Sequence, residues 1–400
     1  PATACLAVNN GTATVGTTNN AGDLILIGRL EVSGGMLNIG SGGNYNNDIE
    51  YASAGTPTIV VSGGTLNVNG QIRRNLNNTS GALIYSQSGG TVIVNGQNQN
   101  VTRAKLEILN ASSSFTMTGG NIIIRQDGGT TYGDLYLRPS NYTVTGGTIN
   151  FGDGSTAANK NFRLIAGIPL WNVEVGTATV TQTVQLYILP LTILNDLAIR
   201  GNSVFNAAGY NVTIKHALIN ENINASGGIN VGGYRTGSAS QVTTFNGTAP
   251  MLVVGNGANL TNFANLVLNS PSTLTIQNNI QVNADLTLSA GTLADNGNQI
   301  VLKGNVYNAT THTSVNGSGG IIFSGASQQT ITGSGSGVFG NVVLNNTFGI
   351  LMKDDSRING KLTFLAGTLY IDDYLLTFGP DATIGGLPDA TRCIILNGAL

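Results

Sequence analysis

The stretch "SGGTLNVNG", residues 62–70, decides the fold, because near copies of it return along the first part of the chain. The copies are "SGGMLNIG" (33–40), "SGGTVIVNG" (88–96), "TGGNIIIR" (118–125) and "TGGTINFG" (145–152). The glycine pairs recur at intervals of roughly 26–30 residues, a period that is typical of proteins built from stacked repeats.

Apolar residues alternate with polar ones after each glycine pair. In residues 62–70 the apolar positions are Leu66 and Val68, the second and fourth residues after the pair. The same positions hold, in the other copies, Leu37 and Ile39, Val92 and Val94, Ile122 and Ile124, and Ile149 and Phe151. A spacing of two indicates a strand with one buried face. Gly, Asn and Thr are too dense to permit long helices.

These short strands predict an all-β fold, a β-solenoid, and most specifically a right-handed parallel β-helix. The period leaves no room for β-α-β units, so each period makes one coil of two or three strands. Each glycine pair lies at a corner, where the backbone takes a positive φ or passes close to the next coil. At about 27 residues per coil, the chain forms roughly 15 coils and a rod about 70 Å long.

A second repeat covers the later part of the chain. Residues 262–304 match residues 338–380 without a gap at an offset of 76, so that Phe263 corresponds to Phe339 and Leu286 to Leu362. We therefore expect two regions: 1–165, with coils of about 26–30 residues, and 166–400, a continuing β-helix with a 76-residue super-repeat. The uncapped apolar strand in "TRCIILNGAL" predicts that the protein continues beyond residue 400.

The composition excludes several classes of function. Charged residues make up 9% of the chain, against about 25% in typical soluble domains, and 17 basic residues face 19 acidic ones. No basic stripe is present to bind nucleic acid. The apolar runs are far shorter than the roughly 20 residues of a membrane-spanning helix. The surface is expected to be neutral and rich in hydroxyl and amide groups.

Acidic residues and histidines offer little chemistry. The adjacent pairs Asp354-Asp355 and Asp372-Asp373 are interpreted as solvated turn residues, because neighbours in a strand point to opposite faces. "FGDGSTAAN" (151–159) resembles one turn of a calcium loop but does not repeat. His216 and His312 have no Cys or acid at metal-ligand spacing and are interpreted as structural or surface residues. No catalytic, cofactor-binding or metal-binding residue is assigned, and no cofactor is expected.

Three further features involve arginine, tryptophan and cysteine. Arg73 and Arg74 are expected in an exposed loop at a corner, with a contact to an acidic sugar as the alternative. Trp171, the single tryptophan, is interpreted as a packing residue; as a sugar-stacking residue it would need a neighbouring aromatic, for which Tyr187 is the candidate. Cys5 and Cys393 lie near opposite ends of the predicted rod and are too far apart to pair.

Residues 283–306 and 319–346 resemble repeats of very large secreted surface proteins of Bacteroidota. The pattern alternates "LTLSAGTL" with "FSGASQQTITG", followed by "FGNVVLNN". The resemblance is good over roughly 240–380, looser over 165–240, and general in the opening half. It implies an extracellular adhesin or gliding-motility protein of the bacterial cell surface, exported by the type 9 secretion route. The chain shows no C-terminal sorting domain of that route.

The expected function is that of a non-catalytic, structural and adhesive rod of a large surface protein. It would attach to glycans or abiotic surfaces through many weak contacts, or display a distal tip. Its expected partners are other segments of the same protein and the secretion and anchoring machinery, and not nucleic acid. The alternatives are a polysaccharide lyase or hydrolase, or a glycan-binding module, on a parallel β-helix. An ice- or mineral-binding surface is a weaker third, because the Thr-rich segments "TATVGTT" and "TATVTQT" do not recur at the coil period.

Overall fold

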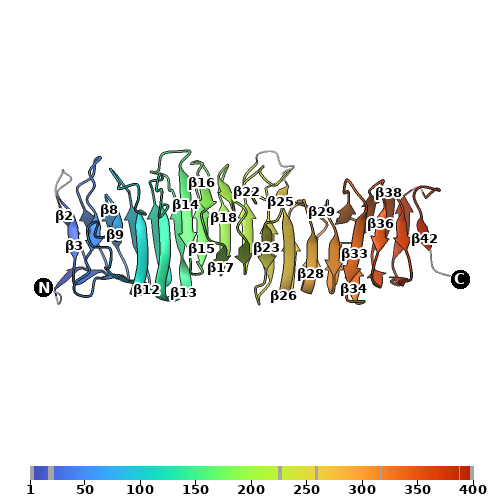
Figure 1. The fold of residues 1–400 in the computed structure, drawn as a ribbon, viewed down its shortest axis with the longest axis horizontal. Coiled ribbons are helices and arrows are strands. Elements are labelled where there is room, and N and C mark those ends of the chain that lie inside the picture. Colours follow the sequence, from blue (N-terminus) through green and yellow to red (C-terminus); the bar gives the residue numbers. More distant parts are fainter. Residues whose placement is uncertain are drawn as a thin grey trace. The chain divides into compact units, whose positions relative to one another are not determined.

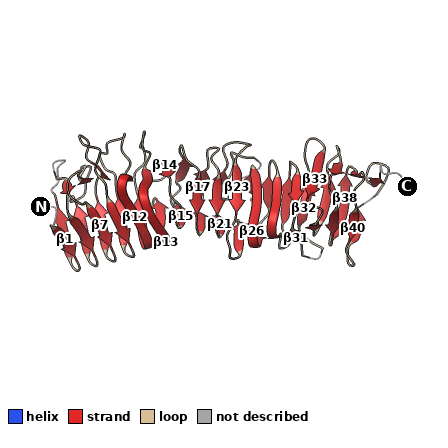
Figure 2. Cartoon of the chain, turned by 60° about the horizontal axis from the view of Figure 1, so that its bottom comes forward, coloured by secondary structure: helices blue, strands red, loops and turns tan. Residues whose placement is uncertain are grey.

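The computed structural model describes residues 4–16, 22–223, 228–256, 260–315, 317–386 and 388–396. Figure 2 shows strands and loops, and no helix, in this part of the chain. Accordingly, no helix long and apolar enough to cross a lipid bilayer occurs among these residues. The chain divides into two compact units, Pro1–Phe205 and Asn206–Leu400. Each unit is a parallel β-helix, which confirms the predicted fold class.

Unit 1 has three faces, each a ladder of parallel strands (blue to green in Figure 1). The first face contains β1 (Cys5–Val8), β4 (Arg29–Val32), β7 (Thr58–Val61), β10 (Ile84–Gln87), the middle parts of β12 (Leu106–Ile124) and β13 (Leu135–Phe151), and β17 (Leu191–Ile193). The second contains β2 (Thr12–Val15), β5 (Met36–Ile39), β8 (Thr65–Val68), β11 (Thr91–Val94), the ends of β12 and β13, β15 (Asn172–Val175) and β18 (Asp196–Ile199). The third contains β3 (Leu24–Leu26), β6 (Ile49–Tyr51), β9 (Ile72–Arg74), the starts of β12 and β13, β14 (Asn161–Ala166) and β16 (Thr183–Leu186). The boundary between the units falls within β19 (Val204–Asn206).

The apolar positions of the repeat form a column inside unit 1. Leu37 pairs with Leu66, Leu66 with Val92, Val92 with Ile122 and Ile122 with Ile149. All five are buried, with at most 2% of each side chain exposed. Full burial of such a side chain contributes about 1.5–3 kcal/mol. The predicted column is therefore confirmed, and it is the interior that holds the coils together.

The two positions of a glycine pair require glycine for different structural reasons. A Cβ on Gly63 would lie 2.5 Å from the carbonyl oxygen of Ser33 in the preceding coil. Gly64 has a φ of +63°, in the left-handed region that other residues rarely adopt. Both predicted causes, close approach and positive φ, therefore act at one corner, the turn between the first and second faces.

Stacking of the coils continues across residues 155–170, where the sequence pattern of the repeat changes. Leu135 of β13 pairs with Leu164 of β14, and Ile149 pairs with Val173 of β15. The loop 152–160 between β13 and β14 therefore does not interrupt the ladder.

Unit 2 also has three faces. The first contains β20 (Val212–Ile214), β23 (Val242–Phe245), the starts of β26 (Asn265–Ile276) and β28 (Leu286–Ala294), β30 (Val306–Asn308), β33 (Gln329–Gly333), β36 (Ile350–Met352), β39 (Leu369–Ile371) and β42 (Ile394–Leu396). The second contains β21 (Ala217–Asn220), β24 (Met251–Val254), the ends of β26 and β28, β31 (Thr311–Thr313), β34 (Gly337–Phe339), β37 (Ser356–Ile358) and β40 (Leu376–Phe378). The third contains β25 (Thr261–Phe263), β27 (Ile280–Val282), β29 (Gln299–Leu302), β32 (Gly320–Phe323), β35 (Val342–Asn345), β38 (Lys361–Ala366) and β41 (Thr383–Gly386). The short strand β22 (Tyr234–Arg235) lies in sequence between β21 and β23.

Several coils in unit 2 are shorter than the period of the opening repeat predicts, whereas Val212 and its partner Thr243 are 31 residues apart. Leu286 pairs with Val306 of the next coil, and Ile350 pairs with Leu369. The 76-residue super-repeat is therefore not a whole number of coils. Leu286 lies on the first face, whereas its counterpart Leu362 pairs with Val342 on the third. All three faces need the same alternation of buried and outward residues, so one sequence pattern serves strands of any face.

Candidate functional site

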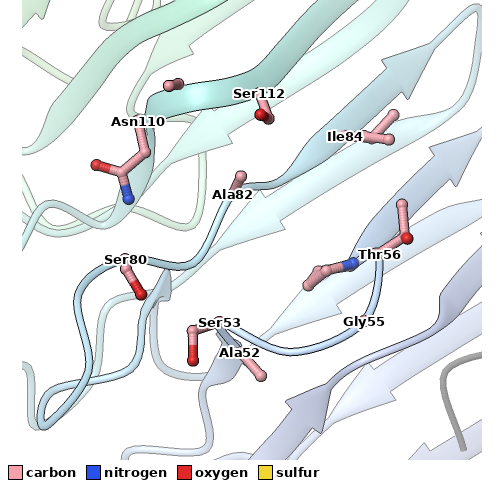
Figure 3. A pocket seen from close by; sticks show the side chains of 11 residues that line it. Ala52, Ser53, Gly55, Thr56, Ser80, Ala82, Ile84, Asn110 and Ser112 are labelled. Atoms are coloured by element: carbon pink, nitrogen blue, oxygen red, sulfur yellow. The ribbon is translucent and has the colours of Figure 1, made fainter.

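A groove of about 610 Å³ lies at the turn between the third and first faces of unit 1. Three segments line it: 52–57, 80–84 and 110–112. Figure 3 shows Asn110 and Ser112 on β12, Ser80 and Ala82 on the neighbouring loop, and Ser53 opposite them. We call this the corner groove.

A bulge in β12 builds one wall of the corner groove. Asn110 pairs with Pro139 and Ser114 with Asn141, so three residues of β12 face a single residue of β13. Asn110 and Ser112 have φ values of 87° and 75°, which few residues other than glycine adopt. The amide of Asn110 donates to the carbonyl oxygens of Thr79 (2.8 Å) and Gly81 (2.6 Å). Bulges and strained residues of this kind concentrate at functional sites.

The chemistry of the corner groove is neutral. Its lining offers hydroxyl groups, one side-chain amide, apolar groups that include Ile84, and backbone, and contains no Asp, Glu, His, Cys, Lys or Arg among the described residues. General acid–base catalysis requires a titratable group within hydrogen-bond reach of the substrate. The groove can therefore form hydrogen bonds with a neutral, polyhydroxylated ligand, but its lining holds no group that would transfer a proton.

Arg73 and Arg74 are not in an exposed loop, and this prediction was wrong. Both lie in β9 and are buried, with 2% and 4% of their surface exposed. The guanidinium of Arg73 binds Asp48 at 2.7 Å and Glu50 at 2.5 Å, and Arg74 binds Glu107 at 3.0 Å. Because burying an unpaired charge is costly, each arginine is held beside carboxylates of neighbouring coils.

The charged cluster extends to two more cations. Arg103 lies 3.3 Å from Glu107, and Lys105 lies 2.7 Å from Asp134 with both side chains completely buried. Burial lowers the pKa of Lys105 and raises the pKa of Asp134, and each charge opposes the shift of the other. Burial also raises the pKa of Asp48 against the pull of Arg73.

Four carboxylates and four cations thus lie buried in or near the strands of the third face. The carboxylates belong to Asp48, Glu50, Glu107 and Asp134, and the cations to Arg73, Arg74, Arg103 and Lys105. One signal for the cluster was present in the sequence: Asp48 and Glu50 precede Arg73 by 25 and 23 residues, close to one coil.

The paired aspartates in unit 2 lie in turns, and one pair holds neighbouring coils. Asp354 accepts a hydrogen bond from the backbone N–H of Gly335, and Asp355 from that of Leu375, both at 2.8 Å. Asp373 is exposed in the bend after β39, and Asp372 beside it is partly buried. The carboxylates of Asp354 and Asp355 therefore serve as backbone caps, each in a different coil contact, and not as a cooperating catalytic pair.

In the calcium-like loop (151–159), hydrogen bonds from within the protein occupy the carboxylate of Asp153. Asp153 accepts hydrogen bonds from Arg125 (2.9 Å) and Thr156 (2.9 Å), and from the N–H of Ser155 (3.0 Å). These bonds, with the Arg125 guanidinium among them, hold the pKa of Asp153 below its ordinary value although burial acts in the opposite sense. Among the described residues no group of three or more His, Cys, Asp or Glu side chains could hold a metal ion.

The sequence neighbours of His312 predicted an isolated side chain. In the structure, however, His312 lies in a buried network of unit 2. Its Nε2 lies 3.1 Å from Asp295, and its Nδ1 accepts the backbone N–H of Gly340 at 3.2 Å. Ser314 donates to the same carboxylate and accepts from the N–H of Asn341. The acid therefore bridges Ser and His, and the histidine acceptor atom is occupied. For a histidine to activate a nucleophile, the histidine must lie between the serine and the acid and accept the proton of the serine. Here the acid lies between the serine and the histidine.

The remaining predicted residues take separate places. His216 is partly buried next to β21, where its carbonyl oxygen accepts the N–H of Leu252. Trp171 is partly buried before β15. Tyr187 follows β16, and the guanidinium of Arg163 lies over its ring, 5.2 Å from the centroid. Cys5 is exposed and Cys393 partly buried, and neither forms a disulfide.

Comparisons of the chain with protein-family models, with curated proteins and with solved structures found no match. Function is therefore inferred from the residues of the chain itself.

Proposed function

We propose that the chain is a non-catalytic, structural and adhesive segment of a large secreted protein of the bacterial cell surface. The observation that carries this proposal is the corner groove, which is set in a parallel ladder and lined by hydroxyl, amide and apolar groups without a charged side chain among its described residues. Such a lining suits weak binding of neutral glycans, and offers no acid–base pair for their cleavage.

Two further observations support it. The Asp, Glu, Arg and Lys side chains that are buried in unit 1 are paired with one another between neighbouring coils. The outward positions of the ladders carry Asn and Thr, as in Asn38 and Asn67, whose amides bond to each other at 3.0 Å. Modest contacts repeated along a surface protein add through effective concentration. The resemblance to large surface proteins of Bacteroidota points to the same function and location.

The test combines adhesion and cleavage. Beads coated with the full chain are passed over films of neutral polysaccharide, and the retained fraction is measured. Ala82→Tyr, which fills the corner groove, should lower retention, whereas Ala178→Tyr, which adds the same ring at an exposed turn outside the groove, should not.

The chain is also incubated with pectin, alginate and glycosaminoglycans. No reducing ends should appear. Release of reducing ends would show a lyase or hydrolase, and equal retention of wild type and Ala82→Tyr would exclude the corner groove as the adhesive site.

A further inference from the structure

A second groove of unit 1, of about 360 Å³, differs from the corner groove in that charged side chains, those of Asp127 and Arg163, line it. It lies between the loop 127–130 and the strands β14 and β16. Asn161 of β14 pairs with Thr183 of β16, and Arg163 pairs with Gln185. The side chains of these four residues point outward and present two amides, a hydroxyl and a guanidinium on one flat surface.

Arg163 is the one cation among the described residues that line this groove. The only acid among the described residues of the lining is Asp127, which lies 3.3 Å from Lys160 and accepts the N–H of Asn161 at 2.8 Å. Arg163 is exposed and, within the described part of the chain, forms no ion pair. One of its nitrogens donates to the carbonyl oxygen of Gly129 at 3.2 Å. The guanidinium also lies over the ring of Tyr187.

The groove is held rigid from below. Asp134 accepts the backbone N–H of Gly129 at 2.8 Å and that of Arg163 at 2.7 Å, so one carboxylate ties both walls together. Lys105 holds that carboxylate in place. The loop is fixed again by the side chain of Gln99, which donates to the carbonyl oxygen of Asp127 at 2.7 Å. A preformed site avoids the entropic cost of ordering on binding.

We propose that this groove binds a carboxylated sugar residue of an acidic polysaccharide, such as a uronic acid. The planar guanidinium of Arg163 matches a carboxylate in two parallel hydrogen bonds. The ring of Tyr187 lies against this guanidinium and holds it in position. Asn161, Thr183 and Gln185 offer partners for sugar hydroxyls. This inference rests on the proposed adhesive function and names the ligand class for a second site of the same unit.

The experiment measures binding of the full chain to polygalacturonate oligomers by isothermal titration calorimetry. Arg163→Gln should weaken binding about tenfold, and Arg163→Lys should recover only part of it, because an ammonium cannot make the bidentate contact. Tyr187→Ala should weaken binding and Tyr187→Phe should not. The matched control is Arg29→Gln, which removes an exposed arginine that is paired with Glu31 on its own strand.

Several results would overturn the proposal. Absence of binding of polygalacturonate oligomers by the wild-type chain would do so. Equal losses of affinity in Arg163→Gln and Arg29→Gln would also do so. A third such result is that dextran sulfate binds as tightly as the oligomers and that Arg163→Gln leaves its binding unchanged. If the wild-type chain still adheres to neutral films, the adhesive function stands and only this ligand is wrong. If the chain cleaves the oligomers to unsaturated products, the non-catalytic function fails as well.

Discussion

The buried pair of Lys105 and Asp134 gives the sharpest test of the packing on the third face. Both side chains have no exposed surface, and their charged atoms lie 2.7 Å apart. Lys105→Met keeps an unbranched apolar side chain of nearly the same length, one heavy atom shorter, and removes the charge. The carboxylate of Asp134 then remains buried with two backbone N–H donors, from Gly129 and Arg163, and no cation.

The expected loss of unfolding free energy is about 3–5 kcal/mol at neutral pH, the cost of breaking a buried ion pair from one side. Asp134→Asn should cost a similar amount, because it leaves the Lys105 ammonium unpaired. The double variant should lose less than the sum of the two single losses, since neither charge remains. It should not recover fully, because one amide oxygen replaces two carboxylate oxygens that accept backbone N–H groups.

The pH dependence has a definite sign. Burial already raises the pKa of Asp134, and Lys105 opposes that shift. In Lys105→Met the folded-state pKa therefore rises further above the value of the unfolded chain. A carboxyl of this kind contributes stability below its unfolded pKa and loses it as the pH rises through the folded pKa. The difference between variant and wild type should be smaller at about pH 4 than at about pH 8.

The assay is urea unfolding followed by the fluorescence of Trp171, the single tryptophan, which lies in the same unit as the pair. Arg29→Met is the control, because Arg29 and Glu31 form an exposed pair whose loss should cost less than about 1 kcal/mol. A loss below about 1 kcal/mol for Lys105→Met, or a deficit that grows as the pH falls, would refute a buried ionised pair.

Substitutions at three other positions test separate parts of the fold. Gly63→Ala should lower the free energy of unfolding by about 1–3 kcal/mol, measured by thermal or urea unfolding, because its Cβ meets the carbonyl oxygen of Ser33. The control is Gly154→Ala, whose Cβ would have no atom within 4 Å and which should change the stability by less than about 0.5 kcal/mol. Equal effects of the two variants would contradict the close approach at Gly63. Leu66→Ala should cost about 2–5 kcal/mol by the same measurements, and Leu66→Asp should unfold the neighbouring coils; an unchanged melting temperature would count against the core. His312→Leu should destabilise unit 2 more than His312→Gln, because leucine leaves Asp295 and the N–H of Gly340 without their partner. The measurement is thermal unfolding followed by circular dichroism. A greater loss of stability in His312→Gln than in His312→Leu would contradict the network.

The repeated corner made the fold predictable from the sequence. Every coil of the opening part must pass the same tight turn, so Gly63 and Gly64 recur with the period of the coil, and Leu66 follows at a fixed distance. The partners of Leu66 in the ladder are then the residues at equivalent positions of the neighbouring copies. In unit 2 the tight turns are more varied, so the shorter coil does not stand out there as a repeat.

The candidate sites were harder to predict because they are built by what differs between coils. The bulge at Ala111 and Ser112 interrupts the regular repeat, and the loops that bury Arg73 lie outside the repeated motif. Long-range pairs such as Lys105 with Asp134 also join residues outside that motif. His312 lies 17 residues after Asp295, a separation that indicates contact only once the shorter coil of unit 2 is known.

Cross-linking tests the stacking of coils most directly. In a background with Cys5→Ser and Cys393→Ser, the pair Asn38→Cys and Asn67→Cys places two thiols at positions that are neighbours in the ladder. Oxidation should form an intrachain disulfide between them. The pair Asn38→Cys and Ile93→Cys lies two rungs apart, about 10 Å, beyond the roughly 7 Å that a disulfide spans. Failure of the first pair to cross-link, or equal cross-linking of the second, would contradict the stacked coils.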